Sequence, residues 1–156
     1  MVTNKEIKLL DSFLKSKGID YVLTGTCALF YHGFLPKDTH AQDIDIIVLT
    51  TNSNRAGIRE ILQDLQKLSD CNNSSYPDAM CITFKVGNTV VNAFEGNVDV
   101  LGGENYPSHQ SMIIDDMLIN VHDVMKVLQA KFKLGRNKDF AFCNALIANI
   151  LKFFNN

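Results

Sequence analysis

The feature of this sequence that most constrains its fold is the glycine turn Gly25-Thr26, which lies between two apolar segments. The segment before the turn, residues 20–24, and a later one, residues 43–49, are rich in Val, Leu and Ile, which favour strands. A short helical run and then a polar loop lie between them. This order predicts two strands of one sheet, joined through a tight turn and a short helix.

The second of these strands carries two carboxylates, Asp43 and Asp45. Side chains alternate along a strand, so both carboxylates project from one face while Ile44 and Ile46 point into the core. Neighbouring carboxylates repel each other and resist burial, and a divalent cation relieves both costs. Asp43 and Asp45 are therefore candidate ligands of Mg²⁺ or Mn²⁺. In the alternative interpretation, one caps the strand and the other faces solvent.

The remaining pattern predicts one domain, residues 1–156, of an α+β class with α/β-like features, in which helices pack on a mixed β-sheet. Two amphipathic helices precede residue 70. Two further helices, within residues 123–154, are expected to complete the domain. Strands are predicted at 81–86 and 89–94 around the turn Gly87-Asn88, at 98–101 before Gly102-Gly103, and at 112–114 and 117–121.

Composition narrows the possible functions. The net charge of −2 leaves no basic surface of the kind that binds DNA, and it weighs against long RNA. The 4 cysteines form no Cys-x-x-Cys pair, which favours reduced thiols in a cytoplasmic protein. No signal peptide is recognisable, and no apolar run approaches the roughly 20 residues of a membrane span. We therefore expect neither DNA nor a membrane as a partner.

Two stretches together resemble the nucleotidyltransferase-fold superfamily. The first is Val-Leu-Thr-Gly-Thr-Cys-Ala-Leu-Phe-Tyr-His-Gly at residues 22–33, followed by Asp-Ile-Asp-Ile-Ile-Val at 43–48. The second, residues 128–140, is similar to the Lys…Gly-Arg-x-Lys-Asp stretch of the abortive-infection type and other minimal bacterial nucleotidyltransferases. Its matching residues are Lys131, Gly135, Arg136, Lys138 and Asp139.

The resemblance implies a metal-dependent enzyme that moves a nucleoside monophosphate from an NTP, with ATP preferred, to an acceptor hydroxyl. That acceptor could belong to a small molecule, a protein or RNA, in settings such as toxin–antitoxin systems or antibiotic modification. A glycine turn lets backbone N–H groups approach phosphates. Gly25 and Thr26 are therefore expected to bind the nucleotide, together with Lys131. The alternative for Gly25-Thr26 is an ordinary strand-to-helix turn.

The family also uses a third acidic residue on a later strand, for which the sequence offers two positions. Asp99, flanked by valines, is expected to be the third catalytic and metal-binding residue with Asp43 and Asp45. Asn92 is the alternative, and it would leave the site one charge short. In that case the chain is a catalytically weak or inactive binding protein with the same fold.

Three further expectations concern the surroundings of this site. Arg136 and Asp139 are expected to pin the last two helices by an ion pair. Lys37 and His40, in the loop before Asp43, are candidates for its rim, with simple solvent exposure as the alternative. The short C-terminal part leaves little room for a substrate domain, so a second copy or a partner chain is expected to complete the cleft.

Overall fold

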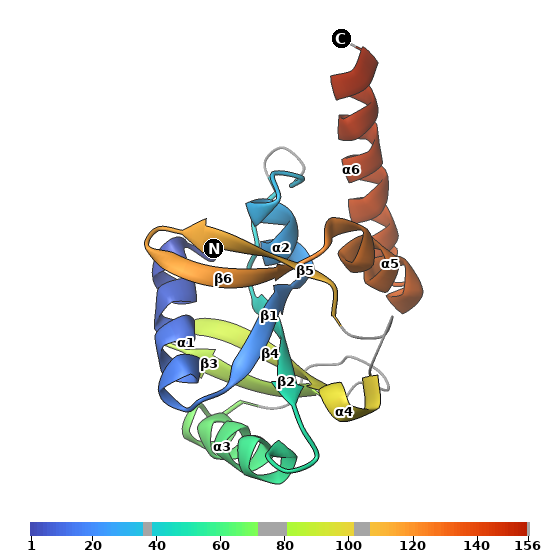
Figure 1. Cartoon of the computed structure of the whole chain (residues 1–156). Helices are drawn as coiled ribbons and strands as arrows, with labels where there is room; N and C mark the ends of the chain where they lie inside the picture. Colours follow the sequence, from blue (N-terminus) through green and yellow to red (C-terminus); the bar gives the residue numbers. More distant parts are fainter. Residues whose placement is uncertain (36–38, 72–80, 102–106, 156) are drawn as a thin grey trace.

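The computed structural model describes residues 1–35, 39–71, 81–101 and 107–155. Lys37 and the pair Gly102-Gly103 lie outside these residues. The class expected from the sequence is confirmed, because helices pack on one mixed sheet. Figure 1 shows α1 beside the sheet, and α6 on the other side of the molecule next to α5.

The described residues form a sheet of 6 strands in the order β3-β4-β2-β1-β6-β5. β2 is therefore an inner strand, paired antiparallel with β1 and parallel with β4. The bounds are β1 Asp20–Thr24, β2 Ile44–Thr50, β3 Cys81–Val86, β4 Thr89–Asn97, β5 His109–Ile114 and β6 Met117–His122.

The helices begin and end close to the signals in the sequence. Thr3 and Glu6 form a capping box at the start of the first helix, and Gly135 ends α5 with a left-handed backbone. Within the part of the chain that the structure describes, no helix is long and apolar enough to cross a membrane. The bounds are α1 Asn4–Ser16, α2 Gly25–Tyr31, α3 Arg55–Leu68, α4 Val98–Leu101, α5 Val124–Leu134 and α6 Asn137–Asn155.

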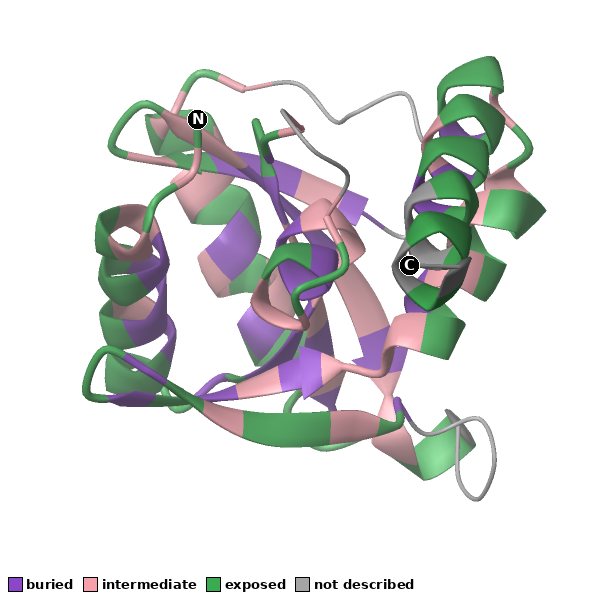
Figure 2. Ribbon diagram, turned by 90° about the horizontal axis from the view of Figure 1, so that it is seen from above, coloured by how far each residue is buried: buried purple, intermediate pink, exposed green. Residues whose placement is uncertain are grey.

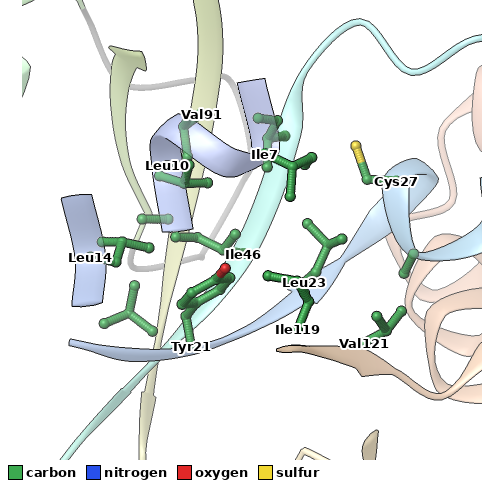
Figure 3. Close-up of a cluster of buried hydrophobic side chains, with 14 of the residues drawn as sticks. Ile7, Leu10, Leu14, Tyr21, Leu23, Cys27, Ile46, Val91, Ile119 and Val121 are labelled. Atoms are coloured by element: carbon green, nitrogen blue, oxygen red, sulfur yellow. The ribbon is translucent and has the colours of Figure 1, made fainter. Parts of the chain in front are cut away.

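The alternation of β2 separates the core from the face that carries the carboxylates. Ile44, Ile46 and Val48 are buried, whereas Asp45 and Ile47 are partly exposed. The buried side meets apolar residues of α1, β1 and β6, including Leu10 and Leu23 (Figure 3). Burial follows the sheet and the inner sides of the helices, and the outer sides are exposed (Figure 2). The core therefore fixes β2 from one side and leaves Asp45 on the other.

Two expected elements differ from the structure. Residues 95–97 extend β4 beyond the strand expected at 89–94, because their backbone pairs with the end of β2. Residues 98–101 form the short helix α4, so the predicted strand around Asp99 is wrong. Short apolar runs such as Val-Asp-Val-Leu do not distinguish a strand from a turn of helix, and neighbouring backbone decides between them.

Candidate nucleotide-binding cleft

The turn and the acidic strand come together because β1 and β2 are antiparallel. Thr24, at the end of β1, pairs with Asp45, near the start of β2. The chain then turns at Gly25 into α2, which contacts both β2 and α5. Beside this junction lies a cleft of about 240 Å³. Its lining comes from three segments of the sequence: Thr26; residues 39–43 and Asp45; and Lys131, Arg136, Lys138, Asp139 and Phe142.

Position 25 requires glycine because a larger residue would collide with the side chain of Asp45. Its φ is +65°, in the left-handed region that favours glycine. A Cβ atom added to Gly25 would lie 2.5 Å from Oδ2 of Asp45, closer than real contacts allow. The carboxylate therefore occupies the space that the missing side chain leaves, and the close approach expected of phosphate at this glycine is made by Asp45 itself.

Asp45 belongs to a line of polar side chains that crosses three strands. The amide nitrogen of Asn92 on β4 donates to Oδ1 of Asp45 over 3.0 Å, and the two residues pair in register. The amide oxygen of Asn92 accepts a 2.9 Å hydrogen bond from the hydroxyl of Thr83 on β3. Asn92 is 1% exposed, so these contacts satisfy an otherwise buried amide.

The two carboxylates differ in their surroundings. Asp43 is exposed at a bend just before β2, and Asp45 is partly exposed at the cleft floor. Burial raises the pKa of Asp45, and the nearby charge of Asp43 raises it further. The Asn92 hydrogen bond and the positive charges of Lys131 and Arg136 oppose this increase. Burial therefore disfavours the ionised form of Asp45, and a bound cation would stabilise it.

Cys27, behind the two carboxylates, is a buried thiol. Its Sγ donates to the carbonyl oxygen of Asp43 over 3.4 Å. Burial raises the pKa of Cys27 to about 12, and the charges of Asp45 and Asp43 add to the shift. This side chain is therefore a protonated packing group that supports the bend at Asp43.

Lys131 reaches the cleft from α5. Its ammonium group donates to the hydroxyl of Thr26 over 3.3 Å and lies 4.7 Å from the ring centroid of Phe142. Burial lowers the pKa of Lys131, while the charges of Asp139 and Asp45 act in the opposite direction. An ammonium group has three donors, so Lys131 keeps donors for a ligand beyond its bond to Thr26.

Arg136 and Asp139 join the end of α5 to the start of α6. Arg136 donates to both carboxylate oxygens of Asp139, at 2.5 and 3.0 Å. Burial opposes ionisation of Asp139, yet its hydrogen bond with Arg136 and the charge of Arg136 hold its pKa below the usual value. The expected ion pair is present, and it fixes the part of the helical pair that carries Lys131.

Asp99 does not lie in this cleft. Asn97, two residues before it, pairs with Thr50 at the far end of β2, about 16 Å along the strand from Asp45. Asp99 is exposed and accepts a 2.5 Å hydrogen bond from the backbone of Asn52. The expectation that it faces Asp43 and Asp45 is wrong, and Asn92 occupies the position beside Asp45.

The donor set suits one divalent cation. Asp43 and Asp45 offer carboxylate oxygens, and Mg²⁺ commonly binds one or two carboxylates together with phosphate oxygens and water. Among the described residues, no group of three or more His, Cys, Asp or Glu side chains could hold a metal ion. Asn92 turns an N–H donor toward Asp45, so it is not a third ligand.

Some members of the site were recognisable from the sequence by other signals. The two-residue turn Gly87-Asn88 fixes the hairpin register and thereby pairs Thr83 with Asn92. From this register, the hydroxyl of Thr83 could have been predicted to lie beside the amide of Asn92. Phe142 lies on α6 among other aromatic residues, and nothing in its spacing separates it from core positions. His40 lines the cleft, as expected for a residue of its rim, and it is also exposed to solvent.

The sequence matches no protein-family model and no curated protein. The structure, however, is similar to solved nucleotidyltransferase structures. The antibiotic-resistance factor ANT(2'')-Ia in solution has a TM-score of 0.58 at 9% identity, with 94% of this chain and 83% of that chain covered. The same protein in complex with adenylyl-2''-tobramycin has a TM-score of 0.55 at 8% identity, with 95% and 90% covered.

A third similar structure is an antigenic nucleotidyltransferase-like protein from Paracoccidioides brasiliensis. Its TM-score is 0.55 at 15% identity, with 94% of this chain and 76% of that chain covered. At such low identities the likeness concerns the fold.

Proposed function

We propose that this chain, whose fold is that of nucleotidyltransferases, binds an NTP with a divalent cation in the cleft and transfers its NMP group to an acceptor hydroxyl. One observation carries the proposal. Thr26, the pair Asp43 and Asp45, and Lys131 come from three distant segments and line a single cleft. Cation ligands and phosphate-binding groups are thus within reach of the same triphosphate.

Each group has a distinct task in this proposal. Asp43 and Asp45 hold the cation, and Lys131 and the hydroxyl of Thr26 donate to phosphate oxygens. When bound, Mg²⁺ or Mn²⁺ neutralises negative charge that develops on the phosphoryl oxygens and polarises the attacking hydroxyl. A bond forms from the acceptor oxygen to the α-phosphorus as the bond to pyrophosphate breaks. The hydroxyl proton is released to solvent.

ATP is the proposed donor. The similar protein ANT(2'')-Ia is in complex with adenylyl-2''-tobramycin, which carries an adenylyl group. The acceptor in the present chain is proposed only as a hydroxyl compound. The net charge of −2 weighs against a long nucleic acid as the acceptor.

A second candidate is a protein that binds nucleotide without turnover. Asn92 favours it, because an amide beside Asp45 supplies neither a third negative charge nor a base for the acceptor hydroxyl. The two candidates share the cleft and its ligand, and they differ in whether pyrophosphate is released.

The experiment has two stages. ATP with Mg²⁺ should raise the melting temperature of the wild type, and ATP with EDTA should not. Pyrophosphate release is then measured with radiolabelled ATP in the presence of a panel of hydroxyl acceptors and a cell extract. Transfer of label supports the enzyme, and binding without release supports the second candidate. If ATP with Mg²⁺ produces no stabilisation, both candidates are rejected.

A further inference from the structure

Asn92 holds the position beside Asp45 in the middle of the sheet. Its backbone pairs with Asp45 on one side and with Thr83 on the other. The hydrogen bonds run in one direction, from the Thr83 hydroxyl to the Asn92 oxygen and from the Asn92 nitrogen to Asp45. Because the Thr83 hydroxyl engages the amide oxygen, the nitrogen is the atom that faces the carboxylate.

This arrangement stabilises Asp45 in a way that a third carboxylate could not. An N–H donor favours the ionised form of a carboxylate without adding charge. An aspartate at position 92 would instead place a second buried negative charge on the neighbouring strand, where strands lie about 4.8 Å apart. Such a pair requires a cation between its members, whereas the amide gives Asp45 a hydrogen bond of 3.0 Å and adds no charge.

We propose that Asn92 is a positioning residue that holds Asp45 without a metal ion and thereby restricts the cleft to a single divalent cation. This inference rests on the proposed nucleotide site and specifies its metal content. The cation is held by Asp43 and Asp45 and is delivered with the nucleotide. A second cation site would need a carboxylate where the chain has Asn92.

The test counts Mn²⁺ ions by electron paramagnetic resonance, first without nucleotide. The wild type is compared with Asn92→Asp and with Asn120→Asp, which adds the same charge on β6, two strands from β2. Asn92→Asp should bind Mn²⁺ at least about tenfold more tightly, because ligand charge tunes affinity, and Asn120→Asp should match the wild type. Equal affinity in the wild type and a folded Asn92→Asp protein would overturn the proposal.

The second titration adds α,β-methylene-ATP, which holds the nucleotide without transfer. The wild type should retain one Mn²⁺ per bound nucleotide, and Asn92→Asp should retain two. Two ions in the wild type would overturn the proposal even if Asn92→Asp failed to fold. Absence of nucleotide binding in the wild type would reject the proposed function. The comparison of Mn²⁺ affinity between the wild type and Asn92→Asp without nucleotide would still test the proposed role of Asn92.

Discussion

The backbone of Gly25 and the carboxylate of Asp45 are in direct contact across the β1–β2 junction, so that a Cβ atom at residue 25 would lie 2.5 Å from Oδ2. The glycine that opens α2 and the acid that faces the cleft are therefore one structural unit. A side chain added at Gly25 would therefore displace the carboxylate of Asp45.

We predict that Gly25→Ala lowers stability by about 1–3 kcal/mol, from the left-handed backbone and from the displaced carboxylate. It should also weaken Mn²⁺ binding. Gly33→Ala is the matched control, because Gly33 has φ +78° with nothing within 4 Å of an added Cβ. It should lose stability through the backbone alone and keep its Mn²⁺ affinity. Equal Mn²⁺ affinities in the two variants would contradict the predicted displacement.

Asp45→Asn should raise stability at neutral pH in the presence of EDTA. Because burial raises the pKa of Asp45, the folded chain binds a proton more tightly than the unfolded chain does. The contribution of Asp45 to wild-type stability therefore falls as pH increases from about 4 through the raised pKa of this group. The Asp45→Asn variant does not lose stability in this way, and the oxygen of its asparagine can still accept a hydrogen bond from Asn92.

Thermal melting between pH 4 and 8 measures this effect. The advantage of Asp45→Asn should be small at pH 4 and should grow with increasing pH, with about 2–4 °C for each kcal/mol gained. Asp64→Asn, on the exposed side of α3, should show no such advantage. A constant difference across the pH range would show that the charge of Asp45 is not its source.

Lys131→Met should reduce ATP affinity by about 10- to 100-fold, since hydrogen bonds to charged groups contribute about 1.5–3 kcal/mol. Methionine keeps an apolar stem against Phe142. The lowered pKa of Lys131 also implies that wild-type affinity falls with increasing pH below the usual lysine range. Calorimetry at several pH values measures both effects. Lys133→Met, outside the cleft lining, is the control, and an equal loss there would remove Lys131 from the site.

Asp99→Asn should leave both ATP binding and Mn²⁺ binding within about twofold of the wild type. Asp99 contacts Asn52 at the far end of β2, and an exposed hydrogen bond contributes only about 0.5–1.5 kcal/mol to stability. Titration of each ligand measures this. A tenfold loss of Mn²⁺ affinity would place Asp99 at the cation after all.

The sequence predicted the class of fold and most of the elements because their signals are local. The alternation from Ile44 to Val48 has the period of a half-buried strand, and α5 and α6 lie in the region 123–154 where two helices were expected. The convergence of Lys131 with the acidic strand was expected only through the family resemblance. Spacing alone does not specify which helix packs against which end of a sheet.

The position of the third polar residue could not be fixed from local pattern. Asp99 and Asn92 both have apolar neighbours, and only the parallel register of β2 and β4 places Asn92 opposite Asp45. That register arises from long-range pairing, which the hydrophobic pattern leaves open. Residue type favoured the carboxylate of Asp99, whereas backbone pairing places the amide of Asn92 beside Asp45.

The division of the cleft between the sheet and the α5–α6 pair has a consequence for local unfolding. Asp45 lies on an inner strand with hydrogen-bonded neighbours on both sides, while Lys131 belongs to a helical pair at the edge of the molecule (Figure 1). Amide hydrogen exchange should therefore be slower around Asp45 than around Lys131. We expect the helical pair to open while the carboxylates stay in place, so that a bound triphosphate that touches both parts slows exchange in α5 more than in β2.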